Sequence, residues 1–262
     1  MLLSPAIRRH SFVFASLVAK SYKTTYRNMA LGVLWSLVNP LVLVAVLSAV
    51  WLVFFAASRQ FPAFVAVALI PFNFSGQCLR ACAQSVVGNA SLVKKVAFPR
   101  QLLPFAAVAT SLADLALQIP LVVAVLLVFP PPGRVLAAPL LWLPAIFALH
   151  LLLVAGTGLL VAGANVLYRD VRYLLESVLV VLFWASPILY DAHDRLAARP
   201  GLALAYYLNP CAGLLESYRR VLYEGAPPHP VPLAMAFGTS LLLAALGLGV
   251  FGRLERDFAD LL

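Results

Sequence analysis

Few residues of this chain combine a reactive side chain with a spacing that could support chemistry. Asp114 is the sole ionisable residue deep inside a long apolar run, a position where a carboxylate can serve in a transport or proton pathway. Thr110, Ser111 and Gln118 lie within about a turn of it on a helix, so a hydrogen-bonded structural carboxylate is an equally good interpretation. Because one carboxylate alone does not make a proton relay, we expect no catalysis within this chain.

The cysteines and histidines do not form a recognisable metal site. Cys78 and Cys82 lie one helical turn apart and could bind a soft metal, but such residues are more often small packing groups. The histidines are scattered across different segments and predicted sides of a membrane: His10, His150, His193 and His229. The chain also lacks GxxxxGK[ST], GxSxG and HExxH motifs. We therefore predict no metal site and no phosphate-loop binding of ATP.

The elements that carry these residues are predicted to be membrane helices. Of the 262 residues, 63% are hydrophobic and only 11% are charged. Soluble domains have about a quarter charged residues, so this chain has too little charge to cover a soluble surface. The composition predicts an all-α integral membrane protein.

Long uncharged runs predict the membrane spans, because a helix needs about 20 apolar residues to cross the hydrocarbon. Five runs reach this length. The next is weaker, since Glu176 leaves only 14 uncharged residues after it, and it spans only if Glu176 lies near an interface or faces other helices. The predicted spans, within a single domain of residues 1–262, are 30–57, 61–82, 102–129, 136–166, 172–190 and 231–252.

Basic residues predict the orientation, because they concentrate on the cytosolic side of membrane proteins. With the N-terminus in the cytosol, 13 of the 19 Lys and Arg residues fall on the cytosolic side and 6 on the other. Six spans then place both termini in the cytosol. The net charge of +9 therefore reports topology and attraction to anionic lipids, and without a binding motif we expect no nucleic-acid partner.

Two segments on the predicted cytosolic side differ from spans. Residues 4–25 place basic residues on one face and apolar ones on the other, which predicts an amphipathic helix at the membrane surface, a soluble basic tail being the alternative. The loop 85–100 predicts a short helix within 88–99 that Pro99 stops. This loop is either a docking element for a cytosolic partner or an ordinary basic loop.

The segment 191–229 is the long external segment in this topology. It is rich in leucine and tyrosine, and its apolar pieces are too short to cross a membrane. This pattern predicts helices that dip into the membrane and return, with a plain external loop as the alternative.

Five stretches occur in order along nearly the whole chain. They are YRNMALGVLWSLVNPL (Tyr26–Leu41), LIPFNFSGQCLRACAQSVVGNASLVKKVAFPRQLLP (Leu69–Pro104), NVLYRDVRYL (Asn165–Leu174), FWASPILY (Phe183–Tyr190) and LNPCAGLLESYRRVLYEG (Leu208–Gly225). Together they resemble the ABC-2 type permeases of polysaccharide-export ABC transporters. The nearest subgroup is the Wzm-like O-antigen permeases, with capsule and teichoic-acid permeases as relatives. Phe72-Asn73 stands where this family often has a tryptophan, and 129–145 has no recognisable family feature.

The resemblance implies a transport subunit, not an enzyme. The family works as a homodimer with two copies of a separate ABC ATPase, which binds ATP and Mg²⁺, so no cofactor is expected in this chain. The expected substrate is a lipid-linked polysaccharide that leaves the cytosol through the bacterial inner membrane. The alternatives are a permease for a small hydrophobic drug or lipid, a membrane enzyme acting on lipid-linked sugars, and a secondary transporter.

The family's functional features can be placed on residues of this chain. The coupling helix that enters a groove on the ATPase would include Asn89, Ser91, Leu92, Lys94, Lys95, Phe98 and Arg100. Candidates for the aromatic lining of the channel are Trp35, Phe72, Phe74, Trp184 and Tyr190. Two external gate helices would cover about 195–209 and 211–224, with gate candidates Asn209, Pro210, Glu216, Tyr218 and Arg219. Candidates for binding the lipid phosphate at the cytosolic entrance are Arg8, Arg9, Lys20, Lys23 and Arg27.

Overall fold

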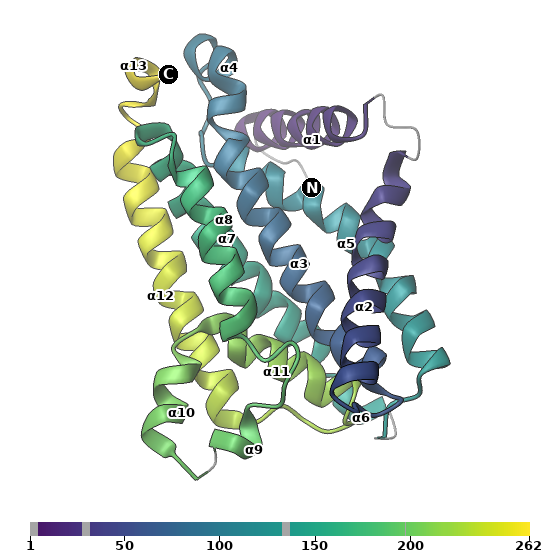
Figure 1. Cartoon of the computed structure of the whole chain (residues 1–262). Helices are drawn as coiled ribbons and strands as arrows, with labels where there is room; N and C mark the ends of the chain where they lie inside the picture. The colour runs from purple at the N-terminus through teal and green to yellow at the C-terminus, as the bar shows by residue number, and fades with distance from the viewer. Residues whose placement is uncertain (1–4, 28–31, 133–136, 197) are drawn as a thin grey trace.

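A computed structural model describes residues 5–27, 32–132, 137–196 and 198–262 (Figure 1). Every regular element in these ranges is a helix, and no strand occurs among them. The all-α prediction is therefore confirmed for the part of the chain that the structure describes.

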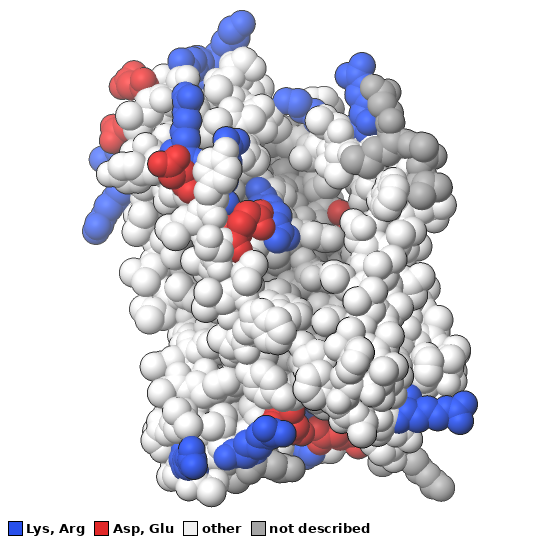
Figure 2. Space-filling view, in the orientation of Figure 1, with Lys and Arg blue, Asp and Glu red and all other residues white. Residues whose placement is uncertain are grey.

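Five helical stretches are long and apolar enough to cross a membrane. They are Gly32–Phe54 (η1 Gly32–Leu34 with α2 Trp35–Phe54), Phe61–Ser85 (α3), Leu102–Val128 (α5), Ala138–Leu167 (α6 Ala137–Leu140 with α7 Leu143–Leu167) and Pro230–Leu254 (α12). Figure 2 shows Lys, Arg, Asp and Glu gathered mainly toward the two ends of the visible face, with little charge in the band between them. This arrangement matches a hydrocarbon layer around the middle of the bundle.

The predicted span 172–190 is the exception. Its helix, α8 (Val171–Ala185), has 15 residues, which at about 1.5 Å per residue is shorter than the hydrocarbon layer. The helix ends because Pro187 disfavours the helical conformation at Ser186, which is extended with φ −109° and ψ 151°. The remaining predicted residues, 186–190, are not helical.

Helix α1 (Pro5–Thr25) lies across one end of the bundle, roughly perpendicular to the long helices (Figure 1). Pro5 stands at its first position, where a missing N–H removes no helical hydrogen bond. Leu17 is buried against Val86 and Leu103, while most polar residues of the helix face outward. The helix predicted over 4–25 is thus present. We call this end, which also carries α4 and the C-terminal helix α13 (Phe258–Leu261), the α4 end.

The predicted coupling helix is shorter than expected. A 3-10 turn, η2 (Val87–Asn89), leads into α4 (Ala90–Lys95), and Val96 is already extended with φ −127° and ψ 130°. A helix continued to Phe98 would place the residue before Pro99 in a conformation that proline disfavours. The chain instead turns Phe98 back onto the apolar cluster beneath α4.

Three shorter helices lie at the other end, which we call the α11 end (Figure 1). The predicted helix 195–209 is divided into α9 (His193–Leu196) and α10 (Pro200–Tyr207), because Arg199, before Pro200, has the non-helical angles φ −137° and ψ 71°. The predicted helix 211–224 corresponds to α11 (Pro210–Leu222), which packs against α3, α7 and α12.

Helices α7 and α12 form a close backbone contact near the middle of their length. A Cβ atom added to Gly156 would lie 2.4 Å from Cα of Ala244, and one added to Gly247 would lie 2.2 Å from the Gly156 carbonyl oxygen. Small residues that let backbones approach in this way are typical of helix pairs in membranes.

Candidate functional site

Helix α4 presents a small basic surface at the α4 end. Val93 is buried and Leu92 half-buried in the apolar cluster beneath the helix, whereas Ser91, Lys94 and Lys95 are exposed. The helix therefore holds its apolar side against the bundle and leaves its polar, basic side free to contact a partner.

The other three predicted coupling residues lie around α4. Asn89 accepts a 2.7 Å hydrogen bond from Nζ of Lys20 and donates a 2.8 Å bond to the carbonyl of Ser85, which links α1 to the end of α3. Phe98 and Arg100 are half-buried. Asn89 and Phe98 therefore help to hold the coupling segment in place.

The predicted phosphate-binding residues all belong to α1 or the turn after it. Lys23 and Arg27 are exposed, and Lys20 is exposed but engaged in its hydrogen bond to the α3–α4 turn. Arg8 and Arg9 lie on α1, but their side chains are outside the described part of the structure.

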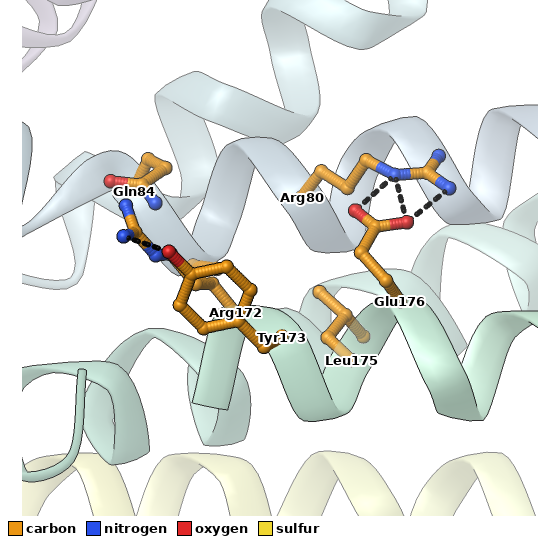
Figure 3. A pocket seen from close by; sticks show the side chains of 7 residues that line it. Arg80, Gln84, Arg172, Tyr173, Leu175 and Glu176 are labelled. Carbon is orange, nitrogen blue, oxygen red and sulfur yellow. Dashed lines mark hydrogen bonds and ion pairs between the residues drawn. The ribbon is translucent and has the colours of Figure 1, made fainter. Parts of the chain in front are cut away.

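A polar pocket between α3 and α8 joins residues that the sequence did not connect (Figure 3). Arg80 binds both carboxylate oxygens of Glu176, with N–O distances of 2.8, 3.0 and 2.9 Å. Arg172 donates a 2.6 Å hydrogen bond to the Tyr173 hydroxyl, and its guanidinium carbon lies 4.5 Å from the centre of that ring. With Gln84 these side chains line a cavity of about 370 Å³.

Arg80 is paired with Glu176 in this pocket, so Arg172 is the cation there that an anion would meet. Arg172 also lines a neighbouring polar cavity of about 400 Å³, together with Arg169 and Asn165. Arginine is suited to phosphate because its planar donors can form paired hydrogen bonds. The one signal for this pocket in the sequence is Glu176, a charged residue within a predicted span. Its partner, Arg80, is 96 positions away and could not be identified from the sequence.

The predicted channel aromatics divide into exposed and enclosed residues. Trp35 is 42% exposed and Trp184 is 60% exposed. Tyr190 is half-buried, and its hydroxyl donates a 3.1 Å hydrogen bond to the Trp184 carbonyl. Phe72 is buried, and Phe74 is fully buried with its ring 5.2 Å from that of His150. The rings of Phe72 and Phe74 thus pack inside the chain and present no surface to a channel in this conformation.

Four of the predicted gate residues belong to α11, and the fifth, Asn209, caps it. Asn209 caps the helix by accepting a 3.1 Å hydrogen bond from the backbone N–H of Cys211, and Pro210 occupies the first position. Tyr218, on another side of α11, lies 3.3 Å from Nδ1 of His150, a buried pair that ties α11 to α7. These residues stabilise and position the helix.

Arg219 is the most deeply buried cation among the described residues, at 1% exposed. Its guanidinium donates to the backbone carbonyls of Pro187, Ile188 and Tyr190 and lies 3.7 Å above the centre of the Phe64 ring. These carbonyls belong to the non-helical segment after α8, where helical hydrogen bonds have ended. Arg219 therefore supplies donors that the backbone would otherwise lack in an apolar environment.

Glu216 lies one turn before Arg219 and is also buried. Tyr207 donates a hydrogen bond to Oε2 of Glu216, and Oε1 lies 3.3 Å from Nδ1 of His193. The rings of His193 and His229 are stacked, with centroids 3.5 Å apart. The expectation that the histidines are dispersed is thus wrong for this pair, because the fold brings the start of α9 beside the residue before α12.

Asp114 is buried in α5, as predicted, but its hydrogen-bond partner is distant in sequence. Thr110 and Ser111 donate to carbonyls of their own helix, and Gln118 donates to the Ser36 carbonyl. The hydroxyl of Tyr26 donates to Asp114 instead. Burial, together with this hydrogen bond, raises the pKa of Tyr26, so the phenol remains a donor at neutral pH. Asp114 thereby anchors the chain that leaves α1.

Removing the hydroxyl of Tyr26 tests this anchor. Tyr26→Phe leaves the Asp114 carboxylate without its donor and is expected to lower the stability of the purified chain by about 1–3 kcal/mol. Thermal unfolding in detergent measures the loss. Tyr22→Phe is the matched control, since the two rings are 5.1 Å apart and only Tyr26 bonds the carboxylate. Equal unfolding midpoints for the two variants would contradict the anchoring role.

Long apolar helices with charge near the two ends define a multi-pass integral membrane protein. A family model described as "ABC-2 type transporter" matches residues 13–223. The chain therefore belongs to the ABC-2 type transporter family, and it is a membrane transport subunit, not an enzyme.

Curated relatives match along almost the whole chain. An O-antigen export system permease protein RfbA of Myxococcus xanthus is 28% identical over 249 residues, covering 94% of this chain and 93% of the relative. A permease of the same name from Klebsiella pneumoniae is 25% identical over 245 residues, covering 93% and 92% respectively.

Proposed function

We propose that this chain is the permease subunit of an ATP-driven exporter that moves a lipid-linked, O-antigen-like polysaccharide from the cytosol across the bacterial inner membrane. The main support for the proposal is the similarity to O-antigen export permeases along almost the whole chain. The alignment with the Myxococcus xanthus relative covers 94% of this chain. Membership in the ABC-2 type transporter family also supports an ABC ATPase as the partner of this chain.

In this proposal α8 is the fifth of six spans. Fifteen helical residues cover about 22 Å, and the segment 186–190 continues the crossing with its carbonyls held by Arg219. Helices α10 and α11 then enter the external side of the membrane and return. The 13 to 6 distribution of basic residues favours an orientation with the α4 end and both termini in the cytosol.

Two copies of the chain would enclose the export channel. Helices α2 and α8 both pack against α3 and both carry exposed apolar side chains. Figure 2 shows the visible face hollowed in its upper part. Trp35 on α2 and Trp184 on α8 are exposed and remain the candidates for stacking on sugar rings, because aromatic faces bind the apolar C–H faces of sugars without requiring one sequence.

The anionic end of the lipid carrier would meet basic groups at the α4 end. Lys23 and Arg27 are exposed there, and the pocket with Arg172 offers donors suited to phosphate oxygens. We therefore extend the proposed entrance from α1 to the pocket between α3 and α8.

ATP and Mg²⁺ would bind to two copies of the separate ATPase, since this chain has no phosphate loop. The exposed polar side of α4, with Ser91, Lys94 and Lys95, is the surface we assign to the ATPase groove.

Charge reversal on α4 is expected to weaken this assembly. Lys94→Glu combined with Lys95→Glu should reduce affinity for the ATPase by at least about tenfold, or roughly 1.4 kcal/mol, since the fold of α4 depends on Val93 and not on these side chains. Co-purification with the tagged ATPase measures the loss. Arg195→Glu combined with Arg199→Glu, two exposed residues at the α11 end, should assemble normally. Normal assembly of the α4 variant would contradict this role for α4.

Substrate-stimulated ATP hydrolysis tests the function as a whole. The complex of this chain with its ATPase, in lipid nanodiscs, should hydrolyse ATP faster when a lipid-linked glycan is added and should not respond to small hydrophobic drugs. Stimulation by drugs but not by the glycan would instead favour an exporter of small substrates. Purification without any ATPase would contradict the proposal and favour a secondary transporter.

A further inference from the structure

We propose that His193, Glu216 and His229 form a binding site for a divalent transition-metal ion such as zinc at the α11 end. These residues are the first of α9, a central residue of α11 and the residue directly before α12. One candidate ligand atom from each residue lies within 4.8 Å of the other two. Two imidazoles and a carboxylate form a donor set that zinc accepts, with a further position open to water.

The buried carboxylate of Glu216 distinguishes this cluster from a surface ion pair. Glu216 is only 5% exposed, and Tyr207 donates a hydrogen bond to its Oε2 atom. Its Oε1 atom is buried and has no hydrogen-bond partner. That atom lies 3.3 Å from Nδ1 of His193, close enough for an ion pair but without the geometry of a hydrogen bond. Because an unsatisfied buried oxygen is unfavourable, a cation between these groups would stabilise the site.

One separation between ligand atoms matches that of a zinc site, and the other two are within 4.8 Å. Two atoms at about 2.0–2.1 Å from a tetrahedral zinc ion lie about 3.4 Å apart. The separation between His193 and Glu216 already has this value within about 0.1 Å. The rings of His193 and His229 are nearly parallel, with an interplanar angle of 7°. Turning one ring about its Cβ–Cγ bond would let both nitrogens face a common point.

The charges of the described neighbours of the cluster balance one another, so the negative charge available to a cation is that of Glu216 itself. Asp191 accepts a 3.0 Å hydrogen bond from the backbone N–H of His193 and adds negative charge. Arg219 is engaged with backbone carbonyls, and Arg220 is paired with Glu224. The nearby positive groups are thus already bound to other partners.

Tyr207 acts as a positioning residue for the proposed site. Its hydrogen bond to Oε2 orients the carboxylate so that Oε1 faces the imidazoles. Such supporting contacts commonly orient metal ligands. A bound ion would cross-link α9, α11 and the start of α12 and would thereby stabilise the α11 end.

Zinc binding by the full chain, purified in detergent, tests this site. Wild type is expected to bind zinc saturably, measured by equilibrium dialysis with metal analysis. His193→Ala and His229→Ala should each weaken binding by at least about 100-fold, since loss of supporting contacts alone costs about 10–100-fold. Zinc should also raise the thermal midpoint of wild type, because an ion that binds only the folded state stabilises it.

Controls separate this site from adventitious binding. His10→Ala, which removes an exposed histidine of α1, should bind zinc as wild type does. Glu216→Gln keeps the shape of the side chain but should lose affinity because it removes the charge. Both histidines are only partly buried, so their variants remain informative even if Glu216→Gln does not fold. Absence of saturable binding by wild type, or unchanged affinity in the His193→Ala/His229→Ala double variant, would overturn the proposal.

Discussion

Replacing Arg219 with alanine is expected to destabilise the protein by about 3–5 kcal/mol, because several buried carbonyls lose their donor and each such loss costs about 1–3 kcal/mol. Its guanidinium binds the backbone carbonyls of Pro187, Ile188 and Tyr190. Burial lowers the pKa of Arg219 to about 10, so the group is still protonated at neutral pH and all of its donors are available. The alanine variant would leave these carbonyls without donors in an apolar environment and remove the cation above the Phe64 ring.

Thermal unfolding followed by size-exclusion chromatography in detergent measures this loss. Arg219→Lys should be intermediate, because an ammonium group cannot reach carbonyls in different directions as the planar guanidinium does. Arg220→Ala is the matched control. Arg220 is half-buried and paired with Glu224 one turn away, an interaction of about 1 kcal/mol or less. If Arg219→Ala unfolded at the wild-type temperature, the carbonyls would not depend on this residue.

Adding one methyl group at Gly247 is the second change with a large expected effect. In Gly247→Ala the new Cβ would lie 2.2 Å from the Gly156 carbonyl oxygen, and the contacting atoms belong to the backbone, so no side-chain rotation relieves the overlap. Helices α7 and α12 would have to separate. Inserting a methyl group into a packed core costs about 1–3 kcal/mol, and we expect the upper end of this range.

Gly249 offers a control two residues further along α12. A Cβ atom there would have no atom within 4 Å, so Gly249→Ala should be neutral or slightly stabilising, since alanine favours a helix over glycine. The difference between the two unfolding midpoints measures the contact between α7 and α12. Equal midpoints would mean that these backbones do not touch as described.

Local patterns in the sequence predicted most of the helices. Hydropathy located five long apolar helices to within a few residues, and the amphipathic pattern of 4–25 located α1. Boundaries failed where a proline acts on the residue before it, as at Ser186 and Arg199. The same effect at Phe98 is consistent with the early end of α4. These signals are local and are present in the sequence.

The partners of polar residues were not predictable in the same way. Asp114 was recognised as buried, but Tyr26 bonds to it from 88 positions away. Arg219 is predicted as an external gate residue, and the carbonyls that it binds belong to a different segment, about 30 positions away. In each case the sequence identified a residue that needs a partner, and the pairing arises only when distant helices pack together.

By itself the sequence determined the class of protein, the apolar helices and the membership in a permease family, because hydrophobicity and helix signals act within one or two turns. Only the tertiary structure decided that Glu176 pairs with Arg80, that Phe74 is enclosed, and that His193 and His229 meet beside Glu216. The physical reason is that a side chain meets its partner, whether a counter-ion or a packing neighbour, in three dimensions. That partner can lie on any helix of the bundle, and no local spacing records which one.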